Sequence, residues 1–444
     1  MRSTLFYIPQ YFPGDPFQLP LIAFGVSWLL IAWLVIAALL IYGWSRWSKS
    51  ALDWYGLLPY VLLVAGGIAF VLPNLLMVMD EAGHKGLPIR TYGLFMVAAV
   101  LSGVLLAAYR ARKMGIDPEV IYSLAMLMTI AGIIGARAFF VIQYREQFWV
   151  PGNIVATLQK ALNVPQGGLV VYGAVLGSFP VGVWYLWSRK LPPLVIADIV
   201  APSLLLGLAL GRMGCFMNGC CYGGFCSTMP PAVTFPAGSP PYQQHEAQGW
   251  RTGIWLKQEE IKPDSRDTTP LPRIRVAYVA PQSAAESAGV RVDDEIKKIN
   301  GKIVSSLSDA QAQLRTSEQV TEVEFARGDI KRWTLQQAPA RSAPVHPAQV
   351  YAAVDAGLLA LLLWAFYPFR RRDGEVTALM FTLHPASRFL LEIVRVDEGG
   401  QFGTGLTISQ WVSIGLFVVG LAIWWYVEQQ PRGSLVPAKR PAVA

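Results

Sequence analysis

Charged residues are scarce in this chain of 444 residues. Asp, Glu, Lys and Arg together make up 15% of the sequence, whereas a soluble protein of average composition carries about 25%. Hydrophobic residues make up 53%, and the formal net charge is +8. The basic residues lie mostly in short loops between apolar runs, which is typical of membrane topology and not of a nucleic-acid surface. We therefore expect an integral membrane protein that binds no nucleic acid.

Motifs of metal-dependent and serine-dependent chemistry are also missing. The chain contains neither H-E-x-x-H nor G-x-S-G, which argues against an intramembrane protease. It has no Cys-x-x-Cys pair with a neighbouring histidine, so we expect no metal site and no cofactor. The four cysteines are Cys215, Cys220, Cys221 and Cys226. In an oxidising compartment they predict one or two disulfides with the pairing left open, and the alternative is that they pack at a helix end.

Histidine is rare as well, with four residues in the chain. His84 and His245 are expected to be ordinary loop residues. His346 and His384 lie near predicted membrane boundaries, and of the two His346 is a candidate for a functional role.

Long apolar runs, in contrast, are abundant. A run of about 18 or more apolar residues with few charges predicts a membrane-spanning helix, and the sequence predicts about nine of them. The predicted spans are 21–43, 57–79, 91–109, 119–143, 168–187, 194–214, 347–367, 376–395 and 408–427. The first is too long for a signal peptide and is preceded by one basic residue, Arg2, so we expect an uncleaved anchor.

The basic residues of the short loops predict how these helices are oriented. With the N-terminus outside the cytoplasm, ten basic residues fall in the inner loops and four in the outer loops. The inner ones are Arg46, Lys49, Arg110, Arg112, Lys113, Arg189, Lys190, Arg370, Arg371 and Arg372, and the outer ones are Lys85, Arg90, Arg145 and Lys160. Because basic residues accumulate in cytoplasmic loops, we expect a multi-pass protein with its N-terminus outside and its C-terminus inside.

Residues 222–345 interrupt the apolar pattern, on the outer side by this topology. The stretch 222–249 is rich in Pro, Gly and Ser and predicts a loop. Alternation predicts strands at 274–279 and 320–325, with a helix at 308–314 between them. Together with S-A-A-E-S-A-G-V at 283–290 and D-D-E-I-K-K-I-N-G at 293–301, this order resembles a PDZ domain. The resemblance implies a peptide-binding groove with its carboxylate loop at 252–256, and the alternative is a spacer domain with a degenerate groove.

Several ionisable residues lie inside predicted spans, where each costs roughly 2.5–3.5 kcal/mol and therefore suggests a function. They are Arg137, Asp198, Arg212, Asp355, Arg388, Glu392 and Arg395. The last three are spaced by four and three residues, which places them on one helical face. One interpretation is an Arg388–Glu392 ion pair that locks two helices together, and the other is a functional site.

The segment G-R-M-G-C-F-M-N-G at 211–219 ends one predicted span. Gly211 and Gly214 allow a helix or a lipid headgroup to approach closely. The guanidinium of Arg212 suits bidentate binding of a phosphate, and Asn218 offers both a donor and an acceptor. These residues predict a phospholipid headgroup site at the outer membrane boundary.

This segment resembles the signature of the prolipoprotein diacylglyceryl transferases, G-R-x-G-N-F-x-N-G, at all but one fixed position. Other blocks of that family follow in the same order. They are R-T-Y-G-L at 90–94, G-A-R at 135–137, G-L-V-V-Y-G at 168–173, A-D-I-V-A-P at 197–202, H-P-A-Q-V-Y at 346–351 and R-F-L-L-E-I-V-R at 388–395. The resemblance implies an all-α polytopic membrane fold with a seven-helix core, here preceded by two helices and interrupted by a small α+β PDZ-like insert.

The expected domains follow from where the resemblance begins and ends. They are an N-terminal extension with two helices (1–87), the two parts of the membrane core (88–222 and 344–428), a loop (223–249), the PDZ-like insert (250–343) and a cytoplasmic tail (429–444).

The resemblance implies transfer of a diacylglyceryl group from phosphatidylglycerol to the lipobox cysteine thiol of a preprolipoprotein, in a bacterial cytoplasmic membrane. Its expected partners are phosphatidylglycerol, preprolipoprotein signal peptides and membrane lipids, with a peptide ligand of the insert as a further option. The residues expected to be catalytic are Arg212, Arg388 and Tyr172. Those expected to bind substrate are Tyr92, Arg137, Asn218, Gly211, Gly214, Glu392, Arg395 and His346.

The chain departs from the family at the residues that the resemblance implies for proton transfer. The family's H-G-G-L is Y-G-A-V here, so its His is replaced by Tyr172, whose phenol is a weak base near neutral pH. The first Asn of the signature is Cys215, the Glu after Asn-Gly is Cys220, and a Glu further on is Ala352. The alternative prediction is therefore a catalytically weakened relative that binds lipid or lipoprotein as a membrane adaptor through its PDZ-like domain.

Overall fold

The computed structural model describes residues 4–9, 20, 27–47, 61–62, 64–71, 78–79, 85–150, 152–162, 168, 170–226, 231–259, 273–316, 320–334, 339–395, 401 and 403–435. The chain divides into two compact units. The first unit contains Phe95–Gly115 and Leu194–Ala444, and the second contains Thr4–Leu94 and Ile116–Pro193. Each unit is described by itself.

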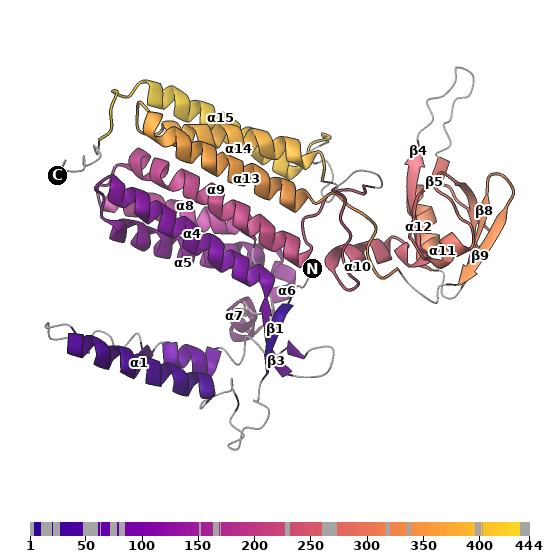
Figure 1. The fold of residues 1–444 in the computed structure, drawn as a ribbon, viewed down its shortest axis with the longest axis horizontal. Coiled ribbons are helices and arrows are strands. Elements are labelled where there is room, and N and C mark those ends of the chain that lie inside the picture. Colours follow the sequence, from indigo (N-terminus) through magenta and orange to yellow (C-terminus); the bar gives the residue numbers. More distant parts are fainter. Residues whose placement is uncertain are drawn as a thin grey trace. The chain divides into compact units, whose positions relative to one another are not determined.

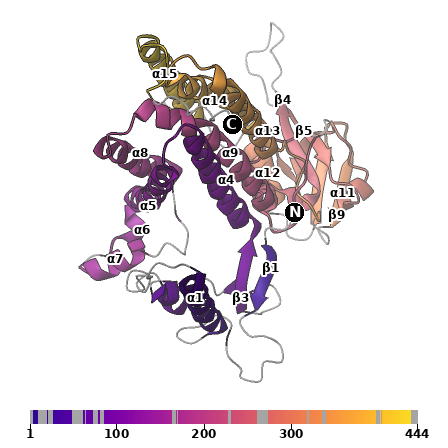
Figure 2. The same ribbon diagram turned by 60° about the vertical axis from the view of Figure 1, so that its left-hand side comes forward.

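The long helices of the first unit lie side by side (Figures 1 and 2). They are α4 (Thr91–Lys113), which belongs to this unit from Phe95 on, α9 (Pro193–Asn218), α13 (Ala348–Phe366), α14 (Glu375–Glu392) and α15 (Ile408–Glu428). A short 3-10 turn, η4 (Tyr367–Phe369), follows α13. A cluster of buried aliphatic side chains, including Leu205, Leu363 and Val376, joins α9, α13 and α14. Burial of such side chains holds the helices together in this unit.

Asp198 near the start of α9 has a clear structural role. Its carboxylate accepts hydrogen bonds from the backbone amides of Gly374 and Thr377, over 2.7 and 2.8 Å, and from the Thr377 hydroxyl over 2.8 Å. These amides belong to the first turn of α14, whose N-H groups have no partner within the helix. Asp198 therefore caps α14 from a neighbouring helix, and its carboxylate suits the positive end of the helix dipole.

The insert is a six-stranded antiparallel sheet with two helices. The strands are β4 (Ile254–Glu259), β5 (Arg273–Val279), β6 (Glu295–Ile299), β7 (Lys302–Ile303), β8 (Val320–Phe325) and β9 (Ile330–Thr334), in the order β4-β5-β6-β8-β9 with β7 paired to β6. The helices α11 (Ala284–Ser287) and α12 (Leu307–Arg315) each begin at a serine cap. Figure 2 shows them beside the strands. The strands predicted at 274–279 and 320–325 and the helix predicted at 308–314 are confirmed.

The stretch 222–249 was predicted as a loop, and this prediction is wrong in part. It contains the helix α10 (Pro240–Ala247), followed by the 3-10 turn η3 (Trp250–Thr252). Proline is tolerated in the first turn of a helix, where its missing N-H costs no hydrogen bond, so two prolines do not prevent α10. His245 on this helix is 3% exposed and packs against Trp255, with ring centroids 4.6 Å apart, so it is not an ordinary loop residue. His84 lies outside the described residues.

The second unit combines helices with a small sheet (Figure 1). Its helices are α1 (Trp28–Trp47), the π-turn η1 (Gly67–Val71), α5 (Pro118–Gln143), α6 (Arg145–Phe148), α7 (Ile154–Leu162) and α8 (Val171–Ser188). Its strands β1 (Thr4–Pro9), β2 (Val78–Met79) and β3 (Lys85–Arg90) pair in the order β1-β3-β2, which the sequence did not predict. A Cβ at Gly135 would lie 2.4 Å from the carbonyl oxygen of Gly173, so α5 and α8 touch through their backbones.

Five helices are long and apolar enough to cross a membrane: Thr91–Lys113, Pro118–Gln143, Pro193–Asn218, Ala348–Phe369 and Ile408–Glu428. Each coincides with a predicted span. Helices also occupy the predicted spans near 21–43, 168–187 and 376–395, as α1, α8 and α14, without being among the five. The predicted span 57–79 lies largely outside the described residues. The chain is thus a mostly helical, polytopic membrane protein.

Candidate functional site

The signature segment lies where α9 ends, and hydrogen bonds fix the turn that follows it. The backbone amide of Gly223 donates to the carbonyl of His346 over 2.8 Å, and that of Gly224 donates to the carbonyl of Val394 over 2.9 Å. These bonds tie the turn to the start of α13 and the end of α14. A Cβ at Gly223 would lie 2.7 Å from the Cβ of His346, so the close approach requires glycine.

Two amide side chains support the same turn. Gln349 on α13 is 1% exposed and donates from its Nε2 to the carbonyl oxygen of Cys220 over 2.7 Å. Asn218, the last residue of α9, hydrogen-bonds the thiol of Cys220. The ring of His346 lies with its Nδ1 3.4 Å from the Tyr351 hydroxyl. Gln349 was not among the predicted site residues because its partner is a backbone carbonyl 129 positions away in the chain.

Two arginines share one buried carboxylate at this end of α14. Glu392 is 2% exposed, Arg388 pairs with its Oε2, and the Nη1 of Arg395 lies 3.8 Å from the same oxygen. The hydroxyl of Thr407, the N-cap of α15, donates to the Oε1 of Glu392 over 3.2 Å. The predicted Arg388–Glu392 pair is therefore present, and Thr407 connects it to α15. The carboxylate of Glu392 thus holds the guanidinium groups of Arg388 and Arg395 close together, and guanidinium groups are the side chains that best suit a phosphate or carboxylate ligand.

Arg212 adds a third guanidinium to this region. The charges of Arg212 and Arg388 both act on the imidazole of His384. Asp355 acts on it as well, and the carboxylate of Asp355 accepts a hydrogen bond from the hydroxyl of Ser387 over 2.8 Å. His384 therefore lies among a carboxylate and two guanidinium groups.

His384 is a functional candidate that the sequence analysis did not single out. Its Nδ1 is buried and has no hydrogen-bond partner in the described part of the chain. A neutral imidazole with an open nitrogen can accept a proton. The available signal was its position four residues before Arg388, which places both side chains on one face of α14.

Three thiols lie together in the signature. The Sγ atoms of Cys215, Cys220 and Cys221 are within 4.8 Å of one another, but none of the four cysteines forms a disulfide, so the predicted disulfides are not formed. Hydrogen bonds with the other two thiols hold the pKa of Cys221 below its usual range. The charges of Arg395 and Arg212 act in the same direction. Three thiol ligands are one fewer than the four of a structural zinc site.

Three of the predicted site residues belong to the second unit. Arg137 on α5 is 8% exposed, and its guanidinium donates to the carbonyls of Ala161, Lys160 and Gly168 over 2.7, 3.1 and 3.2 Å. It thereby anchors the segment that precedes α8. Tyr172, in the first turn of α8, is 45% exposed, and Tyr92, at the start of α4, is 38% exposed.

The first unit contains the other eight predicted site residues at one end of its helices. They are Arg212, Asn218, Gly211, Gly214, Arg388, Glu392, Arg395 and His346. A set of apolar helices with several arginines at one end defines a polytopic membrane protein whose ionisable residues are candidates for a function.

Comparisons with known proteins agree with this class. Residues 82–426 match the family model of the prolipoprotein diacylglyceryl transferases. The chain is 33% identical to a phosphatidylglycerol–prolipoprotein diacylglyceryl transferase of Rhodopirellula baltica, over 98% of this chain and 92% of that protein. A transferase of the same description from Corynebacterium glutamicum is 24% identical over 77% of this chain and 80% of its own length, and one from Trichormus variabilis is 34% identical over 35% and 52%. The chain belongs to the prolipoprotein diacylglyceryl transferase family.

Proposed function

We propose that this protein transfers a diacylglyceryl group from phosphatidylglycerol to the cysteine thiol of a preprolipoprotein lipobox. The observation that carries the proposal is that the charges of Arg212 and Arg388 both act on His384 in the first unit. Arg388 also pairs with the carboxylate of Glu392, as does Arg395. Full-length similarity to the Rhodopirellula baltica transferase supports the enzyme over the adaptor alternative.

The reaction requires two kinds of assistance. The thiol sulfur forms a bond to a glyceryl carbon, the bond from that carbon to the phosphate oxygen breaks, and glycerol phosphate leaves with the bonding electrons. Arg212 and Arg388 stabilise the charge on the departing phosphate, and Asn218 orients the headgroup. Glu392 positions Arg388, and Arg395 supports it, since both arginines pair with the carboxylate of Glu392.

The proton of the attacking thiol needs an acceptor. An unperturbed thiol has a pKa of about 8.5, so a base near the site increases the fraction of thiolate. We assign this role to His384, whose Nδ1 has no hydrogen-bond partner in the described part of the chain and whose ring is subject to the charges of Asp355, Arg388 and Arg212. The resemblance to the family assigns Tyr172 a further role as a hydrogen-bond donor to the lipid, and it assigns Tyr92 and Arg137 to substrate binding.

The proposed topology places this chemistry on the outer face of a bacterial cytoplasmic membrane, with nine spans. The N-terminus and the insert are outside and the C-terminus is cytoplasmic. The bias of basic loop residues supports this orientation. The proposed domain boundaries follow the sequence resemblance, with 1–87 as an extension and 250–343 as the insert.

The insert is proposed to bind an extended peptide in the manner of a PDZ domain. Among the described strands, β4 ends the sheet, and its other side pairs with β5. The side chain of Gln258 on β4 reaches the backbone amide of Leu307 at the start of α12 over 3.4 Å. A peptide strand added beside β4 would therefore lie next to α12, which is the arrangement of β-strand addition.

The experiment that tests the proposed function uses the purified full-length protein, phosphatidylglycerol vesicles and a lipobox peptide. Mass spectrometry should detect the thioether-linked diacylglyceryl peptide and the release of glycerol phosphate. Arg212→Ala and Arg388→Ala should each abolish product formation in a folded, inserted protein, because each removes a charge-assisted bond worth roughly 1.5–3 kcal/mol. Near-normal activity of both variants would show that the headgroup assignment is wrong.

A further inference from the structure

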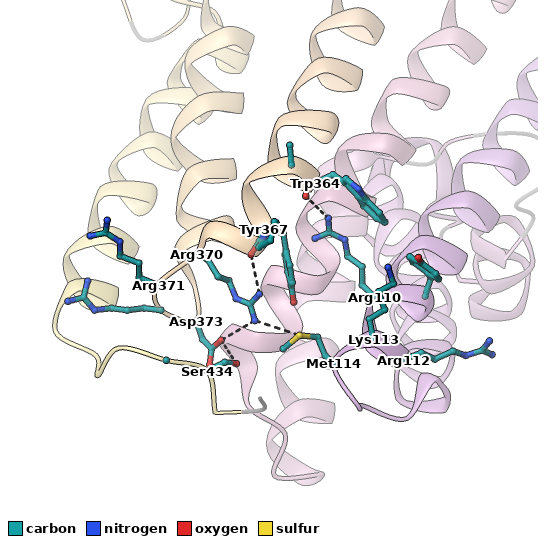
Figure 3. A pocket seen from close by; sticks show the side chains of 15 residues that line it. Arg110, Arg112, Lys113, Met114, Trp364, Tyr367, Arg370, Arg371, Asp373 and Ser434 are labelled. Atoms are coloured by element: carbon teal, nitrogen blue, oxygen red, sulfur yellow. Dashed lines mark hydrogen bonds and ion pairs between the residues drawn. The ribbon is translucent and has the colours of Figure 1, made fainter. Parts of the chain in front are cut away.

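A second cationic region lies at the opposite end of the first unit's helices. There a pocket of about 1020 Å³ is bounded by the C-terminal end of α4, the turn from α13 to α14 and the residues after α15. Six basic side chains line it: Arg110, Arg112, Lys113, Arg370, Arg371 and Arg372. The acidic residue that lines it is Asp373. Figure 3 shows the pocket, with charged side chains around it from the end of α4 and from the turn between α13 and α14.

Arg110 is the most deeply buried of these cations, with 5% of its surface exposed. Its guanidinium lies over the rings of Trp364 and Tyr367, at 4.0 and 4.2 Å from their centroids, and its Nη2 donates to the carbonyl of Trp364 over 3.1 Å. Its Nη1 is buried without a hydrogen-bond partner among the described residues. Figure 3 shows the side chain between the two aromatic rings.

Arg370 brings a second buried guanidinium to the same ring. It lies 4.0 Å from the centroid of Tyr367, and its side chain is 9% exposed. Its acidic neighbours are Asp198 at 3.8 Å and Asp373 at 3.6 Å. Both carboxylates also serve backbone amides, because Asp198 caps α14 and Asp373 accepts from the amide of Leu435 over 2.8 Å.

The charges in this pocket therefore do not balance. The two carboxylates near Arg370 also accept hydrogen bonds from backbone amides. In the described part of the chain, no carboxylate oxygen lies within 4 Å of the guanidinium of Arg110. Burying a guanidinium without a counter-charge is costly, and a bound anion relieves that cost. The guanidinium of an arginine is a rigid planar fork of N-H donors, and its contacts with two aromatic rings hold it in place, which suits a phosphate.

The surroundings identify which phosphate fits. The rings of Tyr109 and Trp364, which line the pocket, are stacked with their centroids 6.2 Å apart, and aromatic side chains of this kind favour the headgroup level of a bilayer. Leu105 and Phe369, next to the pocket along α4 and after α13, are 60% and 75% exposed. Apolar surface beside a phosphate site matches a molecule that carries acyl chains.

We propose that this pocket binds the phosphate of an anionic phospholipid in the membrane leaflet opposite the transfer site. The lipid headgroup neutralises Arg110, and the exposed rim residues Arg112 and Arg371 contact the rest of the headgroup. The site is separate from the signature segment, so its occupation does not depend on the transfer reaction.

The test uses the full-length protein in phosphatidylcholine nanodiscs that contain a small fraction of phosphatidylglycerol with a photoreactive headgroup. After irradiation, mass spectrometry should find crosslinks in residues 105–114 or 362–373. Arg110→Gln should reduce these crosslinks about tenfold, which corresponds to about 1.4 kcal/mol of binding free energy. Arg189→Gln, which removes a basic residue outside this pocket, should leave them unchanged.

Two further arms decide the remaining alternatives. The double variant Arg112→Gln/Arg371→Gln alters only exposed side chains, and it should also reduce the crosslinks, even if Arg110→Gln fails to fold. Unlabelled phosphatidylglycerol should compete with the probe and inorganic phosphate should not. Equal crosslinking in wild type and the double variant, or full competition by inorganic phosphate, would overturn the proposal of a lipid site.

Discussion

Replacing Glu392 by glutamine tests whether the buried carboxylate positions the phosphate-binding arginine. Glutamine keeps the size of the side chain and an acceptor for the Thr407 hydroxyl, and it removes the negative charge. At 3.8 Å the attraction between Arg395 and Glu392 is about 4 kcal/mol before desolvation is subtracted. Breaking a buried pair by removing one partner typically costs 3–5 kcal/mol. Because glutamine retains hydrogen bonds, we expect the lower end, about 3 kcal/mol.

The activity of this variant should fall further than its stability explains. Arg388 loses its fixed position, and we expect at least about a tenfold loss of transfer per folded molecule, equivalent to about 1.4 kcal/mol of transition-state stabilisation. Unfolding in mixed micelles measures the free energy of unfolding and the fraction of protein that is folded. The lipobox-peptide assay measures the rate of transfer, which is then divided by that folded fraction.

Glu375 provides the matched control. It is 7% exposed, lies on the same helix at its other end, and accepts a hydrogen bond from the amide of Arg371 over 2.8 Å. Glu375→Gln should destabilise the protein by about 1 kcal/mol through the helix dipole and leave transfer per folded molecule unchanged. If Glu392→Gln is as active as Glu375→Gln, Glu392 has no positioning role and this reasoning is refuted.

Three other predictions follow from the same structure. Tyr172→Phe should lower the rate of transfer at least about tenfold, and Tyr172→His should be tolerated. Full activity of Tyr172→Phe would show that the side chain serves in packing and that its hydroxyl has no catalytic role. Burial lowers the pKa of His245 to about 4, so the folded state resists its protonation. Stability should therefore be complete above about pH 6.5 and fall by about 3 kcal/mol as the pH drops towards 4; hydrogen exchange of α10 would show this, and His245→Phe should remove the dependence. Cysteine labelling should find position 301 outside and position 371 inside the cytoplasm, and a cytoplasmic position 301 would end the outward-facing assignment of the site.

The predictable features of this protein depend on local periodicity. Arg388, Glu392 and Arg395 follow helical spacing inside an apolar run, so their shared face could be derived from the sequence. The strands of the insert alternate in hydrophobicity, and the structure has them at the predicted positions. The signature at 211–219 combines glycines with an arginine and an amide at a helix end, which is the pattern that predicts the first half of the proposed site.

The features that were missed depend on contacts between distant segments. Asp198 caps a helix 176 residues away, and β1 pairs with β3 across the first two helical segments. The burial of His245 follows from its packing on Trp255, which composition does not reveal. Proximity along the chain suggested disulfides among the cysteines, but the three clustered thiols stay reduced in the structure. His384 became a candidate only when Arg212 and Asp355 were found around it.

The central claim is that the chain is an active diacylglyceryl transferase despite Tyr172 in place of the family's histidine. Expression in a bacterium depleted of its own transferase tests this most directly. We predict that the wild-type chain restores growth and the lipid-modified form of a reporter lipoprotein, and that Arg212→Ala and His384→Gln do not. Membrane-inserted wild-type protein that neither restores growth nor modifies the reporter would contradict the account and favour the adaptor.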